Sequence, residues 1–319
     1  MNRFVLFLIR RWSAWRHAPL AWLACLLVVS LPLLSWFEVD DVLDQQLQEH
    51  LTPHQVRQRS IWLPDYQFVQ RLQLPGIVAN ASDIVYVRER NSYFVVVNSP
   101  AQLYEYSEDF VLKARVDLVD FEDPEALAYD GKGHLLIGEE RRQSVVTLPL
   151  AKLDGPIVRG DLGTLTIAEQ ADNNRGLEGM AFDADTQVLF ASQEQRPIRL
   201  FEVAGVVQPA PEALADPTYQ AAVSMLGVQR LRMEDVSALH YDPHTRHLLI
   251  LSDQSRLLAE FDSGYTPVSF MDLEQGFNGL DQSMPQAEGV TLGAQRDLLI
   301  VSEPNLLYRY TSKPRATQM

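Results

Sequence analysis

Three glutamates occupy the same place in a repeated stretch of sequence, and together they could bind a metal ion. They are Glu125, Glu178 and Glu288, which open the motifs Glu-Ala-Leu-Ala-Tyr, Glu-Gly-Met-Ala-Phe and Glu-Gly-Val-Thr-Leu. Carboxylates gathered in one place raise one another's pKa unless a cation or a basic side chain lies among them. An oxygen-rich group of this kind suits calcium, which takes about six to eight oxygen ligands. The repeat therefore predicts a calcium site built on these glutamates.

A second series of acidic residues closes the apolar run that follows each of these motifs. Its members are Glu140, Asp253 and Glu303. Glu125 and Glu140 are 15 residues apart, and so are Glu288 and Glu303. A hairpin folded about Gly131-Lys132-Gly133 brings the first pair opposite each other, so we expect both series at one end of the fold. The alternative is a solvated acidic rim, since acids at strand ends are common.

For the other residues that could do chemistry, the sequence favours structural roles. Asp183 and Asp185 resemble a metal-binding loop, but an Asp-x-Asp pair in a hairpin is typical of turns. Three histidines fall at predicted turns and a fourth lies on a predicted strand: His134, His244, His247 and His240. The sequence contains no G-x-S-x-G, P-loop or dinucleotide-binding motif. The sequence therefore names no catalytic residue.

The elements that must position the acids are strands, because the motif recurs five times along the chain. The five copies begin at Ser82, Glu125, Glu178, Ser237 and Glu288. A turn and two further apolar runs follow each copy, and strands repeating in units of about 40–60 residues are typical of a β-propeller. The first strand of each propeller blade lines the central channel, so equivalent positions from different blades converge on one axis.

Ring closure follows from a missing strand. Most copies are followed by a fourth strand-like segment, at residues 111–119, 157–165 and 268–273, but the last copy ends at Tyr310 with three. Phe68–Leu74 shows the alternation of the missing strand, and we predict that it pairs with Leu306–Tyr310. Pairing removes an exposed sheet edge. The sequence thus predicts an all-β, five-bladed propeller over residues 68–312, followed by a tail at 313–319.

A propeller of six blades is the alternative, because residues 205–233 form an oversized connection. Three prolines in this connection disfavour a complete extra blade: Pro209, Pro211 and Pro217. We predict a surface insertion that carries a short helix at Tyr219–Leu226.

The N-terminal part of the chain predicts a membrane anchor. Ala18–Phe37 is almost unbroken apolar sequence, and 20 helical residues span about 30 Å, the thickness of the bilayer core. Three arginines, Arg10, Arg11 and Arg16, place residues 1–17 in the cytoplasm by the positive-inside rule. A cleaved signal peptide is the alternative, but the apolar run is long and lacks an A-x-A-like site. We therefore expect one transmembrane helix in the inner membrane and a periplasmic C-terminal domain behind a spacer at 38–67.

Charge is distributed unevenly along the chain. All 42 acidic residues lie from Glu38 onward, and without the four N-terminal arginines only 23 basic residues oppose them. Such a domain should repel nucleic acid and attract cations. Cys25, the only cysteine, lies inside the apolar run, so the predicted exported part contains no disulfide.

The stretch Asn174-Arg175-Gly176-Leu177-Glu178-Gly179-Met180-Ala181 resembles the SdiA-regulated, YjiK-like family of bacterial propellers, which carries an N-x-G-x-E-G-[hydrophobic]-A motif. The predicted anchor, Leu74-Pro75-Gly76 and the closing Ser302-Glu303-Pro304-Asn305 fit the same family, and the resemblance covers Leu63–Thr311. It implies a periplasmic propeller with calcium in its central site and no established reaction. By motif match it implies that Glu125, Glu178 and Glu288 are ligands, whereas Ser82 and Ser237 stand at the corresponding positions of the other copies.

Two functions fit these observations. The first is a calcium-binding domain displayed in the periplasm for a small molecule or a partner protein. The second is a calcium-dependent hydrolase of a lactone, ester or phosphoester, since a metal ion in a channel can polarise a carbonyl or phosphoryl oxygen. The sequence favours the first function because no general base accompanies the acids. A histidine beside the glutamates would favour the second.

Overall fold

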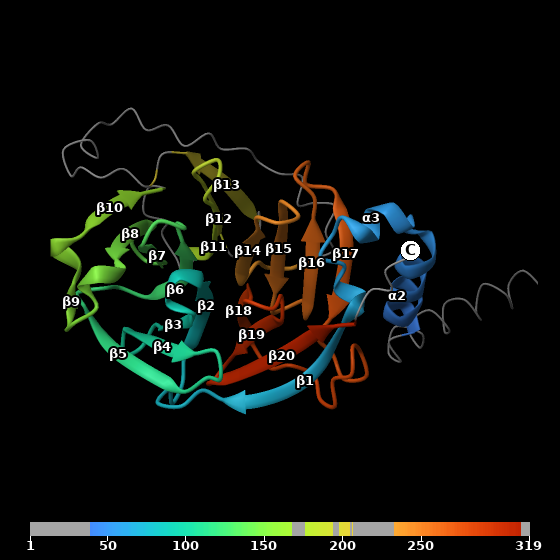
Figure 1. Ribbon diagram of the computed structural model, residues 1–319, viewed down its shortest axis with the longest axis horizontal. Helices are drawn as coiled ribbons and strands as arrows, with labels where there is room; N and C mark the ends of the chain where they lie inside the picture. The colour runs from blue at the N-terminus through green and yellow to red at the C-terminus, as the bar shows by residue number, and fades with distance from the viewer. Residues whose placement is uncertain (1–38, 168–175, 194–197, 205, 207–232, 314–319) are drawn as a thin grey trace, which may run out of the picture. The chain divides into compact units, whose positions relative to one another are not determined.

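The computed structural model describes residues 39–167, 176–193, 198–204, 206 and 233–313 (Figure 1). The chain divides into two units, and helix α2 (Val39–Leu51) belongs to the first, which ends at Thr52. No helix among the described residues is both long and apolar enough to cross a membrane. The predicted anchor at 18–37 and the short helix at 219–226 lie outside the described residues.

The second unit, from Pro53 onward, contains an all-β propeller of five blades. One strand of each blade lies innermost, around the axis: β2 (Ala81–Val87), β6 (Pro124–Tyr129), β11 (Leu177–Asp183), β14 (Ala238–Asp242) and β18 (Ala287–Leu292). Each innermost strand contacts the innermost strands of both neighbouring blades, so the five strands form a closed ring. The prediction of a five-bladed propeller is confirmed.

The remaining strands continue each blade outward by antiparallel pairing. The second strands are β3 (Ser92–Val97), β7 (His134–Glu139), β12 (Val188–Gln193), β15 (His247–Ser252) and β19 (Leu298–Ser302). The third strands are β4 (Gln102–Ser107), β8 (Ser144–Pro149), β13 (Arg199–Ala204), β16 (Leu257–Phe261) and β20 (Leu306–Ser312). The outermost strands are β5 (Leu112–Val119), β10 (Gly163–Thr166), β17 (Pro267–Asp272) and β1 (Tyr66–Gln73). The blade that begins with β11 has three described strands.

Burial explains why the second strands are nearly continuous apolar runs. Every residue of β3 is buried, whereas exposed and buried residues alternate at the end of β5. A strand covered on both faces by neighbouring blades has no polar side to show, while an outer strand keeps one face in water. Five apolar clusters fill the spaces between blades and form the core.

The predicted ring closure is confirmed. Strand β1 pairs antiparallel with β20, and Phe68 lies opposite Tyr310. The Phe68 ring packs edge-on against Tyr310, with ring centroids 5.8 Å apart, and tilts against Tyr308 at 6.1 Å. The first described strand thus supplies the outer edge of the last blade (Figure 1).

Residues just before β1 also pack on the propeller, although the sequence assigns them to the spacer at 38–67. After helix α3 (His54–Gln58), the backbone N–H groups of Ile61 and Trp62 donate to the two carboxylate oxygens of Glu260, at 2.6 and 3.0 Å. Glu260 lies on β16 and is fully buried. This carboxylate therefore fixes the N-terminal segment to the blade of β14–β17.

One predicted strand, residues 157–165, is wrong as a single element. The structure divides it into β9 (Ile157–Val158), which runs parallel to β5 of the neighbouring blade, and β10. A 3-10 turn, η4 (Arg159–Asp161), separates the two, and Arg159 Nε donates to the buried Glu139 carboxylate at 2.7 Å. The remaining 3-10 turns are η1 (Leu63–Asp65), η2 (Arg88–Arg90) and η3 (Leu150–Lys152).

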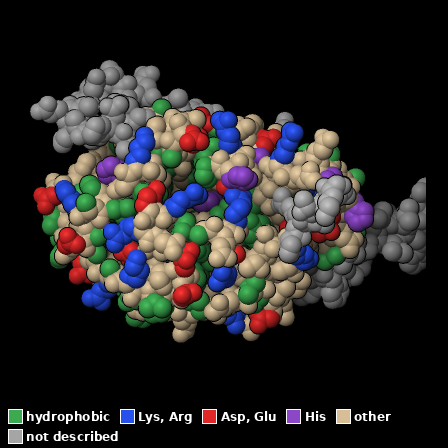
Figure 2. Space-filling model, viewed as in Figure 1, with side chains coloured by type: hydrophobic (Ala, Val, Ile, Leu, Met, Phe, Trp, Pro, Cys, Tyr) green, Lys and Arg blue, Asp and Glu red, His purple; other side chains and the backbone are tan. Residues whose placement is uncertain are grey.

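Acidic and basic side chains are interspersed over the face of the molecule shown in Figure 2. Elsewhere in the described residues, Arg309 pairs with Asp297 and Arg256 pairs with Glu274. The glutamates of the first repeat series stand at the starts of the innermost strands, and the acids of the second series follow the ends of the second strands.

Candidate metal centre

A β-bulge marks the same repeat position in four of the five innermost strands. The bulged residues are Ser82, Glu125, Glu178 and Glu288, where the pairing with the second strand shifts by one residue. A bulge leaves its extra residue unpaired and re-aims the side chain. The repeat therefore sets four bulged side chains at the starts of the strands around the axis. Ser237 immediately precedes β14 at the fifth position.

The glycine that follows two of these glutamates has a steric cause. A Cβ added to Gly289 would lie 2.7 Å from the Cα of Asp83, and one added to Gly179 would lie 3.0 Å from the carbonyl carbon of Ala238. Neighbouring innermost strands approach too closely there for a side chain. The Glu-Gly pair thus combines a bulged carboxylate with close contact between blades.

Three carboxylates come together beside the bulge of β6. Ligand oxygens of Asp123, Glu125 and Glu140 all lie within 4.8 Å of one another, and the structure brings no other such group together among the residues that it describes. Burial raises the pKa of Glu125 to about 7, and the charges of Asp123 and Glu140 add to the shift. Burial and Asp123 likewise raise the pKa of Glu140. The charge of Asp123 thus makes ionisation of both Glu125 and Glu140 harder.

Glu288 connects this group electrostatically with acids of the next blades. The pKa of Glu288 is raised to about 8. Burial is the largest cause, and the charges of Asp253, Glu125 and Glu303 raise the pKa further. The pKa values of Asp253 and Glu303 are themselves raised, mainly by burial. Glu288 therefore interacts electrostatically with three other predicted site residues, whereas Glu125 and Glu140 are the two of the six that belong to the group within 4.8 Å.

Glu178, the sixth predicted residue, lies half-buried at the bulge of β11. It is not one of the three carboxylates within 4.8 Å. Two residues upstream in the same motif, the backbone N–H of Gly176 donates to Glu140 Oε1 at 3.3 Å. A Cβ at Gly176 would collide with Glu140. This glycine of the motif therefore packs directly on the acidic group.

Sequence reasoning missed three residues of this region, although the repeat contains a signal for each. Asp123 and Asp235 both stand two residues before the bulge position of their copy. Asn98 directly follows the second strand of its blade, as Glu140, Asp253 and Glu303 follow theirs. Glu194 follows β12 in the same way but lies outside the described residues. The second series is therefore a series of oxygen-bearing side chains rather than of acids alone.

Asn98 is the member of that series with an unsatisfied oxygen. Its Nδ2 donates to Glu125 Oε1 at 2.6 Å, while its Oδ1 is buried and has no hydrogen-bond partner. A buried amide oxygen without a partner is costly, and a neutral oxygen is a common calcium ligand. The donor set is thus made of oxygen throughout, negative in excess and incompletely satisfied, which fits calcium. One cation is in contact, because the largely exposed Arg141 donates to Asp123 Oδ2 at 2.8 Å.

Asp83 lies one layer further along the channel and holds neighbouring blades together. Its two carboxylate oxygens accept from the backbone N–H groups of Ile84 and Leu127, each at 2.7 Å. A further backbone hydrogen bond comes from Val290, and burial raises the pKa of Asp83 well above its usual value. The other four copies have glycine or alanine at this position. Asp83 therefore links three innermost strands through their backbones.

The weaker candidates take part in local contacts. Asp183 accepts from the backbone N–H of Asp185 at 2.9 Å, as a turn residue does. His134 Nδ1 contacts Asp130 at 2.7 Å, and His247 Nδ1 contacts Glu260 at 2.6 Å.

Two comparisons with known proteins found similarities. A family model described as SdiA-regulated matches residues 58–311. Among solved structures, the chain is similar to the WD40 β-propeller domain of Doa1, with a TM-score of 0.45 and 12% sequence identity. That similarity covers 78% of this chain and 97% of the Doa1 domain.

Proposed function

The chain belongs to the SdiA-regulated family, and we propose that its propeller binds calcium at the acidic end of the channel and acts as a ligand- or protein-binding domain. The observation that carries this proposal is the group of Asp123, Glu125 and Glu140, whose ligand oxygens lie within 4.8 Å of one another. Groups with such raised pKa values cluster at functional sites.

The neighbours of these three carboxylates support the same assignment. Asn98 supplies the partnerless Oδ1, and Glu288 adds a carboxylate whose pKa is raised by burial and then by nearby charges, including that of Glu125. A calcium ion would supply the positive charge that lets the carboxylates ionise together. Backbone contacts position the set: Glu140 N donates to the Asp123 carbonyl oxygen at 2.9 Å, and Glu303 N donates to that of Gln286 at 2.9 Å.

Calorimetric titration of calcium into the chelator-treated, full-length protein tests this function. We expect saturable binding that Glu125→Gln and Glu140→Gln each weaken about tenfold or more, since each variant keeps the side-chain shape and removes one charge. Asp185→Asn is the matched control, because Asp185 is an exposed carboxylate in a turn. Unchanged affinity in both glutamate variants, or no binding at millimolar calcium, would contradict the proposal.

We propose further that Ala18–Phe37 anchors the chain in the inner membrane and that the propeller lies in the periplasm. The support is the length of the apolar run, the arginines before it and the acidic residues after it. Membrane fractionation and N-terminal sequencing of the purified protein test this. Recovery in the membrane fraction with an intact N-terminus is expected, and a mature N-terminus beyond Phe37 would show a cleaved signal instead.

The calcium-dependent hydrolase that the sequence left open gains no support from the described residues. His134 and His247 contact other acids, and His240 lies on β14 three residues after Ser237, which stands at the repeat position of the glutamates. No described histidine belongs to the group of Asp123, Glu125 and Glu140. The binding domain is therefore the function that we propose.

A further inference from the structure

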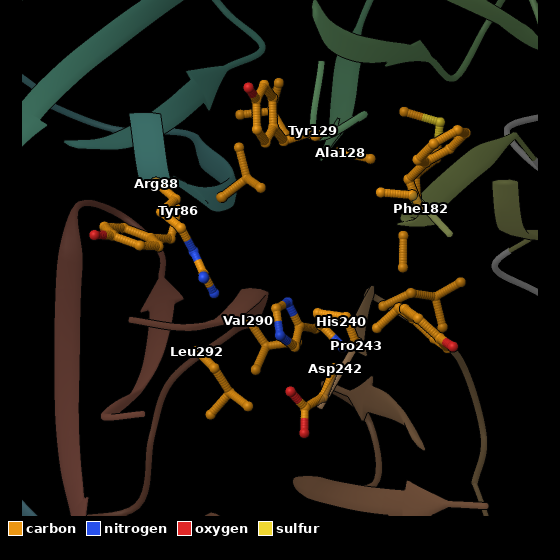
Figure 3. A pocket seen from close by; sticks show the side chains of 18 of the residues that line it. Tyr86, Arg88, Ala128, Tyr129, Phe182, His240, Asp242, Pro243, Val290 and Leu292 are labelled. Atoms are coloured by element: carbon orange, nitrogen blue, oxygen red, sulfur yellow. The ribbon is translucent and has the colours of Figure 1, made fainter. Parts of the chain in front are cut away.

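A cavity of about 410 Å³ opens at the opposite end of the channel (Figure 3). All five innermost strands line it with residues from their later halves. Glu125 stands at the start of β6 and Tyr129 at its end, and four residues of strand span about 13 Å. The cavity is therefore separate from the acidic group, and its volume falls in the range of small-molecule sites.

An apolar layer forms the deep part of this cavity. It consists of the residues two positions after the bulge position in each copy: Ile84, Leu127, Met180, Leu239 and Val290. All five are at most 2% exposed. This layer lies between the acidic end and the cavity, so a molecule in the cavity meets apolar walls rather than the carboxylates.

Aromatic rings surround the upper part of the cavity. Residues four positions after the bulge position are aromatic in four copies and leucine in the fifth: Tyr86, Tyr129, Phe182, Tyr241 and Leu292. The hydroxyl of Tyr86 already donates to Asn91, and that of Tyr129 accepts from the backbone N–H of Gly133. What these rings offer is flat apolar surface, which favours a planar ligand.

Arg88 supplies an uncompensated positive charge at this cavity. It lies in η2, directly after β2, and points into the cavity (Figure 3). Arg88 forms no ion pair within the part of the chain that the structure describes. Arg296, the other arginine of the lining, is held by both carboxylate oxygens of Asp242, at 3.0 and 2.7 Å. Glu89 and Asp185 also line the cavity, but both are exposed and water screens their charges.

His240 adds a hydrogen-bonding group within the apolar wall. It lies in the middle of β14, points into the cavity and has no hydrogen-bond partner among the described residues (Figure 3). Burial lowers the pKa of His240 to about 4, although Asp242 opposes the shift. The imidazole is therefore neutral at pH 7 and retains one N–H for a ligand.

We propose that this cavity binds a small planar apolar molecule carrying one carboxylate, with the carboxylate on Arg88 and His240 and the ring system among the aromatic side chains. A guanidinium pairs well with a planar carboxylate. This inference rests on the proposed function, because it names the class of ligand that the binding domain takes. None of the proposed calcium ligands belongs to the cavity. The cavity should therefore bind such a molecule with or without calcium.

The test uses three probes of one shape and different charge: 2-naphthoate, its neutral isostere 2-naphthamide, and the cationic 2-naphthamidine. Each is titrated calorimetrically into full-length protein, once in calcium and once in chelator. We expect one naphthoate per chain, bound about tenfold or more tightly than naphthamide, with naphthamidine weakest. Arg88→Gln should remove the preference for naphthoate over naphthamide, and the core should stay intact because Arg88 is exposed.

Arg115→Gln is the matched control, because Arg115 is an exposed arginine on the outer strand β5. It should keep the wild-type preference. Equal affinity for naphthoate and naphthamide, an unchanged preference in Arg88→Gln, or no binding at about 1 mM naphthoate would overturn the proposal. If calcium binding fails while naphthoate selectivity persists, only the calcium proposal falls; the reverse result removes only this site.

Discussion

At the scale of single residues, the bulged glutamates make stability depend on pH in an unusual direction. The unfolded protein releases the protons of these glutamates near pH 4.5, whereas the folded protein retains them to about pH 7 at Glu125 and about pH 8 at Glu288. The folded state therefore binds more protons between these limits. The stabilising effect is complete below about pH 4.5 and is lost as the pH rises through the folded pKa values.

We expect the free energy of unfolding in chelator to fall by about 2–5 kcal/mol between pH 5.5 and 8, since each group contributes about 1.4 kcal/mol per pH unit below its folded pKa. Urea unfolding of the full-length protein at several pH values measures this. The double variant Glu125→Gln, Glu288→Gln should flatten the dependence, because it removes both carboxyl groups. A wild-type stability that rises across this window, or an equally steep slope in the double variant, would contradict the account.

Asp83 provides a second test at this scale. In Asp83→Asn, the amide NH₂ would face one of the two backbone N–H groups that now donate to the carboxylate oxygens. An unpaired buried donor costs about 1–3 kcal/mol, so urea unfolding should show a loss of that size. Asp117→Asn, at an exposed position of β5, should change little. Equal stability of Asp83→Asn and the wild type would show that Asp83 does not link the strands.

The repeat predicted which acids approach one another but not the whole site. Glu125, Glu140 and Glu288 could be predicted because equivalent positions of a sequence repeat lie on equivalent strands around the propeller axis. Asp123 has a counterpart in Asp235 two residues before the repeat position, but the sequence alone does not show that Asp123 turns toward the glutamates, because this depends on its left-handed backbone conformation, with φ of 53°. Asn98 was not predicted because the second series was defined by acidic residues. Asn98 is neutral, and it brings a side-chain oxygen to the same position.

At the scale of elements, the closing strand carries a clear consequence. The buried side chains Tyr66 and Leu74 frame β1, and Phe68 packs on the tyrosines of β20. Burial of side chains this size contributes about 1.5–3 kcal/mol each. A chain that begins at Pro75 should therefore lose at least about 3 kcal/mol of stability.

Thermal melting measures this loss, with a chain that begins at Pro53 as the control, because it retains the segment bound to Glu260. The shorter chain should melt at a clearly lower temperature or without a cooperative transition. Identical melting of the two chains would mean that β1 does not close the ring.

Strand existence was predicted better than strand partners. Strands such as β3 and β15 could be predicted from continuous apolar runs, because both faces of these strands are buried. Residues 157–165 misled the prediction, because the pattern could not show that Ile157 pairs with the preceding blade. The docking of Ile61 on Glu260 is a contact between residues 199 positions apart, which no local pattern contains.

At the scale of the whole molecule, the two ends of the channel differ. One end carries the acidic group, and the other end holds the cavity with Arg88. The five innermost strands build both, because in every copy the repeat position of the glutamates lies at or beside the start of the strand, and the residue four positions later lies at or beside its end. Calcium that binds only the folded state should therefore stabilise the whole ring. At a free concentration 100-fold above the dissociation constant, the gain is about 2.7 kcal/mol.

Thermal melting of the full-length protein in calcium and in chelator tests the central claim most directly. A gain of that size corresponds to a rise in Tm of about 5–10 °C for a domain of this length. We expect this rise for the wild type and for Asp185→Asn, and a much smaller rise for Glu125→Gln. Equal melting temperatures of the wild type in calcium and in chelator would contradict it and would leave the acids as a solvated rim.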